Sequence, residues 1–168
     1  MNSILGIVLH FQRRNDEAAD QLLRTLDLEP GYHHAHWILS IVYHAMSRHA
    51  DAEREVRAAL SISDEEMPTK GLLGWVLGAM GRREEADAVL EELQDLSKRR
   101  YVPATSFSQA CVGVGDHDRA VEWLERAYQD REAPLVWLDI MPGWDLLRPD
   151  PRFQDLVRRV GLAPTSPR

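Results

Sequence analysis

The phrase REEADAVL, residues 83–90, occurs in related form three more times, and each occurrence lies 34 residues from the next. The counterparts read NDEAADQLL (15–23), HADAEREV (49–56) and HDRAVEWL (117–124). Their shared alanines are Ala18, Ala52, Ala86 and Ala120. A fixed period of this length is typical of repeat proteins, in which each unit is one supersecondary motif.

Other positions keep the same period and indicate what each unit contains. Apolar residues recur at spacings of three and four in each half-unit, which is helical periodicity. The pattern breaks near residues 13–14, 47–48, 81–82 and 115–116, so two helices of about 12 to 14 residues fit in each unit. Twelve positions before each alanine stands a small residue, directly preceded by a large apolar one: Leu5-Gly6, Leu39-Ser40, Leu73-Gly74 and Phe107-Ser108. Since one helix pair cannot bury both of its apolar faces, the pairs are expected to stack as an α-solenoid.

These columns resemble the tetratricopeptide repeat family. The second unit follows the family pattern with Leu39, Ser40, Tyr43, Ala52, Val56 and Ala59, and the first follows it with Leu5, Gly6, Ala18, Leu22 and Pro30. The closing proline occurs only at Pro30, Cys111 stands where tyrosine is usual, and Thr25 and Leu93 replace the second alanine. The resemblance implies an all-α fold of four helix-turn-helix repeats, with units at about 1–32, 33–66, 67–100 and 101–134.

The residues after 134 depart from the repeat. Prolines 142, 149 and 151 divide them, and Asp150-Pro151 predicts the start of a helix with an apolar stripe of Phe153, Leu156, Val157 and Val160 that ends at Gly161. We interpret 135–162 as a C-terminal capping segment and 163–168 as a tail. The phrases GDHDRAVEWLERAY and DPRFQDLVRRVGL are similar to the C-terminal repeat arrays of bacterial multidomain regulatory proteins, which implies that the chain is part of such a regulator or a detached tail of one.

The composition of the chain argues against several classes of function. The chain has 168 residues and a formal net charge of −7, with no long basic run, so direct nucleic-acid binding is not expected. No segment approaches the roughly 20 apolar residues of a membrane span, and the opening apolar stretch has no preceding positive charge, so we expect a cytoplasmic protein. The one cysteine, Cys111, falls in a core column, which favours a buried thiol over a nucleophile. No catalytic constellation is present, so no enzyme activity and no cofactor are predicted.

The stretch GYHHAHW, residues 31–37, holds three of the seven histidines. On a helix, His33 and His36 are neighbours while His34 points elsewhere. A structural zinc site needs four ligands, and nothing nearby in the sequence completes one, so no metal site is predicted.

The resemblance places the first helices of successive units on a concave face. Two tryptophans there, Trp37 and Trp75, suit anchors of a binding surface. The resemblance therefore implies a non-enzymatic scaffold that binds a peptide or amphipathic helix in an apolar groove. The alternative is a regulatory tail whose groove is filled by its own N-terminal extension or used for self-association as a homodimer. Packing of these residues against each other also stays open. The predicted groove residues are Ile7, His10, Phe11, His34, Trp37, Ile38, Ile41, His44, Leu72, Trp75, Val102, Thr105, Gln109 and Val112.

Overall fold

The computed structural model describes residues 2–63 and 67–162, and within these ranges the secondary structure is entirely helical, as the repeat pattern predicts. The predicted tail at 163–168 lies outside the described residues. Four antiparallel helix pairs are followed by two 3₁₀ helices and one further α-helix. The bounds are α1 Asn2–Phe11, α2 Asn15–Leu28, α3 His33–Ala45, α4 His49–Ile62, α5 Met67–Ala79, α6 Arg83–Ser97, α7 Ala104–Val114, α8 His117–Gln129, η1 Ala133–Trp137, η2 Pro142–Trp144 and α9 Pro151–Arg159.

The repeated alanines and small residues lie where the two helices of a pair meet. All four alanines of the 34-residue column have no exposed surface. A Cβ atom added to Gly6 would lie 2.7 Å from Cγ of Leu22, so α1 and α2 approach closely at this point. In the fourth unit the hydroxyl of Ser108 donates a hydrogen bond of 2.8 Å to the carbonyl oxygen of Ala120. Small side chains at this column therefore permit the close packing of each pair.

The turns inside the four units have one geometry. A residue one or two positions after each first helix has positive φ, at Arg13, Ser47, Gly81 and Gly115. The next N–H then donates back to a carbonyl five residues earlier, as in the 2.8 Å bond from Arg48 to Tyr43. This is the Schellman pattern, which satisfies carbonyls that a helix end otherwise leaves free. Identical turns keep the first helices parallel and bring their C-terminal ends to one edge of the solenoid.

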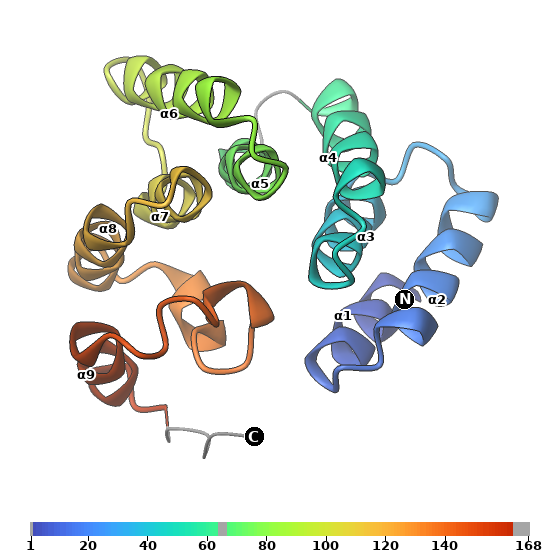
Figure 1. Cartoon of the computed structure of the whole chain (residues 1–168). Helices are drawn as coiled ribbons and strands as arrows, with labels where there is room; N and C mark the ends of the chain where they lie inside the picture. The colour runs from blue at the N-terminus through green and yellow to red at the C-terminus, as the bar shows by residue number, and fades with distance from the viewer. Residues whose placement is uncertain (1, 64–66, 163–168) are drawn as a thin grey trace.

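The eight repeat helices form an arc (Figure 1). The first helices contact one another in series, α1 with α3, α3 with α5 and α5 with α7, and so form the inner layer. Residues 133–148 turn back into the interior of this arc, where η2 contacts α3. The C-terminal residues thus reach helices that precede them by about three repeats.

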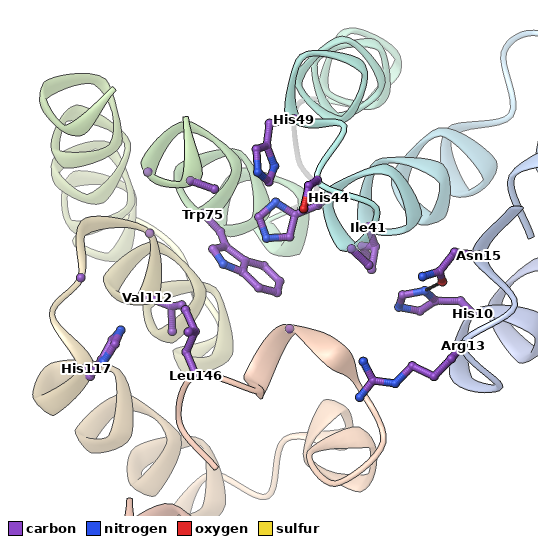
Figure 2. A pocket seen from close by; sticks show the side chains of 17 residues that line it. His10, Arg13, Asn15, Ile41, His44, His49, Trp75, Val112, His117 and Leu146 are labelled. Atoms are coloured by element: carbon purple, nitrogen blue, oxygen red, sulfur yellow. Dashed lines mark hydrogen bonds between the residues drawn. The ribbon is translucent and has the colours of Figure 1, made fainter. Parts of the chain in front are cut away.

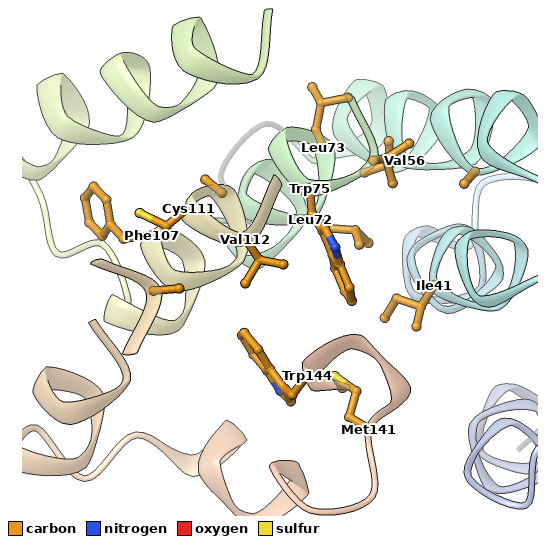
Figure 3. Close-up of a cluster of buried hydrophobic side chains, with 14 of the residues drawn as sticks. Ile41, Val56, Leu72, Leu73, Trp75, Phe107, Cys111, Val112, Met141 and Trp144 are labelled. Atoms are coloured by element: carbon orange, nitrogen blue, oxygen red, sulfur yellow. The ribbon is translucent and has the colours of Figure 1, made fainter. Parts of the chain in front are cut away.

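Residues 133–148, hereafter the return segment, bury an apolar stripe with a spacing of three. A 3₁₀ helix has three residues per turn, so side chains at this spacing share one face. Figure 3 shows Met141 and Trp144 facing Ile41, Trp75 and Val112 of the inner helices. The stripe consists of Leu135, Leu138, Met141, Trp144 and Leu147, each at most 8% exposed.

The final helix begins and ends as the sequence predicts. The Asp150 carboxylate accepts a 2.8 Å bond from the Arg152 N–H, Pro151 occupies the first turn, and Gly161 follows with a φ of 85°. Phe153, Leu156 and Val157 are buried, and α9 packs on α8.

Candidate ligand-binding cavity on the concave face

Most of the predicted groove residues are covered. Trp75 is 6% exposed, because its ring lies between His44, at a centroid distance of 4.3 Å, and Trp144 of the return segment, at 6.3 Å. Phe11 is half-buried and stacks on Trp137 at 5.1 Å. Ile7, Trp37 and His44 are also half-buried, and His34 is exposed. The buried members are His10, Ile38, Ile41, Leu72, Trp75, Val102, Thr105, Gln109 and Val112.

The predicted groove residues do not form one continuous surface, and some of them have structural contacts of their own. The hydroxyl of Thr105 donates a 2.8 Å hydrogen bond to the Glu132 carboxylate, which also accepts the backbone N–H of Thr105 at 3.1 Å. Glu132 stands where the repeat pattern places proline, and here it satisfies the first turn of α7. Thr105 is therefore committed to a helix start. Trp37 and His34 lie together at the other end of α3, with ring centroids 5.2 Å apart.

A cavity of about 610 Å³ lies at the C-terminal ends of the inner helices (Figure 2). Five predicted groove residues line it: His10, Ile41, His44, Trp75 and Val112. The Schellman turns supply Arg13, Ser47 and Gly115, and the return segment supplies Gly143 and Leu146. The cavity is thus lined jointly by the four repeats and the return segment.

The His10 side chain presents one nitrogen atom without a partner. The ring is 1% exposed, and Nδ1 lies 2.9 Å from Oδ1 of Asn15. An amide oxygen only accepts, so Nδ1 carries the proton and Nε2 of the neutral ring is an acceptor. Nε2 is buried and has no hydrogen-bond partner. Burial lowers the pKa of His10, which favours this neutral form.

His44 makes the stability of the protein sensitive to mild acid. Burial, with a smaller contribution from His49, lowers its pKa from 6.5 to about 4. Below pH 6.5 the unfolded chain therefore binds a proton that the folded chain does not bind until near pH 4. Stability should be greatest above pH 6.5 and fall by about 3 kcal/mol as the pH drops to about 4.

Urea unfolding at pH 7 and pH 4.5 measures this loss. A His44→Phe chain keeps an aromatic ring beside Trp75 but does not titrate, so its loss over this interval should be smaller than that of the wild type by about 2 kcal/mol. Equal losses in the two chains would contradict the lowered pKa of His44.

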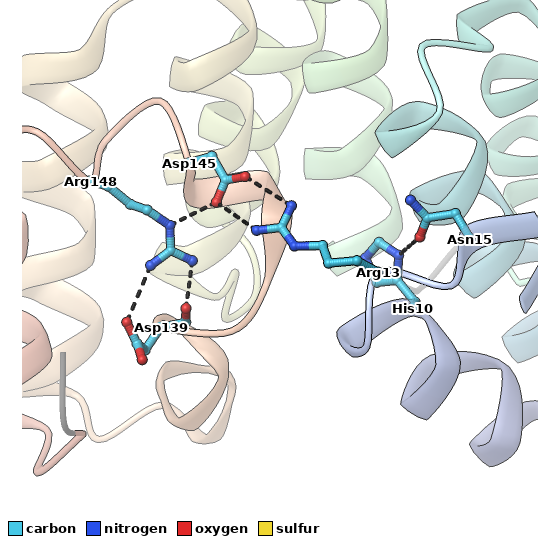
Figure 4. A network of polar contacts seen from close by, with 6 residues as sticks. All are labelled: His10, Arg13, Asn15, Asp139, Asp145 and Arg148. Atoms are coloured by element: carbon cyan, nitrogen blue, oxygen red, sulfur yellow. Dashed lines mark hydrogen bonds and ion pairs between the residues drawn. The ribbon is translucent and has the colours of Figure 1, made fainter. Parts of the chain in front are cut away.

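An ion-pair network connects the first turn to the return segment (Figure 4). The Arg13 guanidinium donates to both carboxylate oxygens of Asp145, at 3.1 and 3.4 Å. Asp145 also accepts a 2.7 Å bond from Nε of Arg148, which in turn reaches Asp139 at 3.2 Å. Arg13 and Asp145 are about half exposed, so this network positions the segment more than it stabilises it.

The histidines of GYHHAHW do not converge. His36 contacts Oε2 of Glu55 at 2.7 Å and the carbonyl oxygen of Pro30 at 2.9 Å, which ties α3 to α4 and to the preceding loop. His33 faces Thr69 of α5 at 3.5 Å. Across residues 2–63 and 67–162, no group of three or more His, Cys, Asp or Glu side chains is arranged to hold a metal ion.

Several cavity residues were missed by the sequence analysis, although a signal for them existed. His49 and His117 occupy one 34-residue column with Asn15, at the first position of the second helix. His10, His44, Gly78 and Val112 form another column, and all four line the cavity. The 34-residue columns next to the turn of each unit therefore predict that these side chains lie together, at the edge of the solenoid where the turns are. The contribution of Gly143 and Leu146 has no such signal, because it depends on the fold of the return segment.

Two further observations bear on function. Cys111 is fully buried, and burial raises the pKa of its thiol to about 11, so it is protonated at neutral pH. In the part of the chain that the structure describes, none of the helices has the length and apolar character required to traverse a bilayer.

Comparison with solved structures identifies similar folds. The chain is similar to the crystal structure of MamA, with a TM-score of 0.52 and 14% identity over 92% of this chain and 91% of that one. It is also similar to a tetratricopeptide repeat protein from Parabacteroides merdae ATCC 43184, with a TM-score of 0.55 and 10% identity over 98% of this chain. It spans 64% of the length of that protein. At these identities the likeness concerns the fold. No curated protein matches the chain.

The sequence itself matches a family description. The model of the family described as Tetratricopeptide repeat matches residues 11–140, which include most of the four units and the return segment as far as Ile140. Proteins of this family generally mediate protein–protein interactions and are not generally enzymes. The 34-residue columns, the paired helices and this match agree, and the chain belongs to the tetratricopeptide repeat family.

Proposed function

We propose that this protein is an interaction scaffold whose apolar concave face binds a short helical peptide in competition with its own return segment. The apolar stripe at 135, 138, 141, 144 and 147 carries the proposal, because it lies on two short 3₁₀ helices and their turns, and Met141 and Trp144 from it face the inner helices (Figure 3). A partner helix with anchors at spacings of three and four would present the same kind of face.

The contacts of the return segment describe what a partner must supply. Trp144 stacks on Trp75 with an interplanar angle of 13°, so an aromatic anchor fits the centre of the face. Aromatic side chains commonly dominate the energy of such interfaces. Since the return segment is tethered, its effective concentration is on the order of millimolar, and an external peptide must exceed that advantage.

A Gly143→Ala chain should release the return segment. A Cβ atom at position 143 would lie 1.9 Å from Cη2 of Trp75, which is closer than any real contact. A labelled synthetic peptide of residues 133–148 keeps its glycine and should therefore bind the Gly143→Ala chain. We expect its affinity for wild type to be at least about tenfold lower, as measured by fluorescence anisotropy.

Gly31→Ala is the matched control, since a Cβ atom there has no neighbour within 4 Å. This control chain should bind the peptide no better than wild type. If the Gly143→Ala chain keeps its helical circular dichroism and still fails to bind the peptide, the concave face is not a peptide site. Trp144→Ala, which removes the anchor without adding an atom, provides a second way to release the segment.

The second candidate is a regulatory tail whose groove stays occluded or is used for self-association. The burial of Trp75 under the return segment favours occlusion, with the chain's own C-terminal residues as the occupant in place of an N-terminal extension. Exposed Ile4, Leu5 and Val8 on α1 favour contact with a second copy. Sedimentation of wild type as a dimer, together with no peptide binding by the Gly143→Ala chain, would select this candidate.

A further inference from the structure

The cavity at the inner-helix ends adjoins the face that the return segment covers (Figure 3), and that segment forms part of its wall. Gly143 and Leu146 line it on one side, and the ends of α1, α3, α5 and α7 surround it on the other (Figure 2). Its volume of about 610 Å³ lies within the range of small-ligand sites. A ligand there would require the return segment to be docked.

The walls of the cavity favour a planar apolar group. Trp75 contributes an aromatic ring, and Ile41 and Val112 contribute aliphatic side chains from the neighbouring inner helices. The His44 ring packs at 4.3 Å from Trp75 and at 5.1 Å from His49, which extends the aromatic wall toward the turn. Stacked or tilted ring contacts at such distances are favourable for aromatic ligands.

The polar atoms in this cavity include an acceptor that requires a donor. Nε2 of His10 is buried and unpartnered, and its role as an acceptor follows from the bond between Nδ1 and Asn15. Nδ1 of His44 and Nδ1 of His49 are also buried without partners. A buried polar atom of this kind ordinarily has a partner, so a ligand with an N–H or O–H group would satisfy it.

The charges around the cavity favour a neutral ligand. The guanidinium of Arg13 is already occupied by Asp145. The negative C-terminal ends of the first helices and the positive N-terminal ends of the second helices meet at this edge, so their dipole charges largely offset each other. Among the described residues that line the cavity there is no Asp or Glu, so a buried cation would lack a counter-charge. A neutral ligand fits best.

We infer that the cavity binds a neutral aromatic group with one hydrogen-bond donor, a phenol or an indole, whose O–H or N–H donates to Nε2 of His10 while its ring lies against Trp75. The group can be a free small molecule or the side chain of a Tyr or Trp residue in a partner. This inference is independent of peptide binding to the concave face.

Fluorine NMR on the full chain tests the inference with two matched probes. 4-Fluorophenol carries the donor, and 4-fluoroanisole has the same ring without it. Wild type should bind 4-fluorophenol about tenfold more tightly than 4-fluoroanisole, because one buried hydrogen bond is lost. A His10→Phe chain should bind 4-fluorophenol about tenfold more weakly than wild type and should no longer distinguish the two probes. His33→Phe, at the opposite end of α3, should behave as wild type.

The comparison of the two probes needs no variant, so it stands even if His10→Phe destabilises the fold. Equal affinity for the two probes in wild type would overturn the inference, as would no binding of either or tighter binding of 4-fluorobenzylamine. N-acetyl-3-fluorotyrosine amide separates the sources: its binding supports a partner side chain, and binding of the free phenol alone supports a small molecule. The Gly143→Ala chain should lose 4-fluorophenol binding while gaining the 133–148 peptide, so failures of the two proposals are distinguishable.

Discussion

An Ala86→Asp chain is expected to lose about 4 kcal/mol of its free energy of unfolding and to melt roughly 10 °C below wild type. Ala86 has no exposed surface and lies where α6 packs on α5. The substitution puts a carboxylate into this contact with no room for water, so the side chain either remains charged without a partner or takes up a proton at a cost in free energy. Thermal melting followed by circular dichroism measures the change.

Ala88→Asp is the control for this prediction. Ala88 lies two residues further along α6 and is exposed, so the same substitution there costs only the difference in helix propensity, about 0.7 kcal/mol at most. If the two chains melt together, the 34-residue column does not mark the contact between the two helices of a unit.

A Gly78→Ala chain is expected to be less stable than wild type by about 3 kcal/mol. Glycine-to-alanine changes inside helices usually have the opposite effect and stabilise the protein by as much as about 1 kcal/mol. The sign reverses because α5 and α7 approach backbone to backbone. A Cβ atom at position 78 would lie 1.8 Å from the carbonyl oxygen of Gly113, and one at position 113 would lie 2.3 Å from that of Gly74. Backbone atoms cannot move aside without separating the two helices.

Gly6→Ala provides the comparison, since the atoms that it meets belong to the Leu22 side chain, the nearest at 2.7 Å. A side chain can change rotamer, so Gly6→Ala should cost about 1 kcal/mol, well below the cost at Gly78. Urea unfolding of both chains gives the two values. A Gly78→Ala chain as stable as wild type would mean that α5 and α7 lie further apart than the structure places them.

The repeat could be predicted from the sequence because its evidence is local and recurs four times. Each column, such as Leu22 with its counterparts in the other units, reports the same contact again, so one substitution at Thr25 or Cys111 does not obscure the period. The turns were equally regular, although Arg13 and Ser47 take up the left-handed conformation that glycine adopts in the other two units.

The cover of the concave face could not be predicted in the same way. An apolar position on an inner helix, such as Trp75, has the same pattern whether a partner or the chain itself covers it. The stripe from Leu135 to Leu147 is visible in the sequence, but its period of three is that of a 3₁₀ helix, and its prolines indicated only breaks. The residues that it contacts on α3 and α5 are more than 60 positions away in the sequence. A local sequence pattern does not indicate contacts over such a separation.

The contacts of Phe11 with Trp137 and of Arg13 with Asp145 have a consequence for how the protein folds. In a repeat array whose units touch only their neighbours, the two ends fray independently and stability grows with each added unit. Here the first helix touches residues beyond the last repeat, which raises the contact order of the array and couples its ends. Such long-range closure slows folding, because the entropy of closing the chain is lost before these contacts form. Because the two ends contact each other, unfolding of either end removes contacts that stabilise the other. The array therefore unfolds more nearly as one cooperative unit.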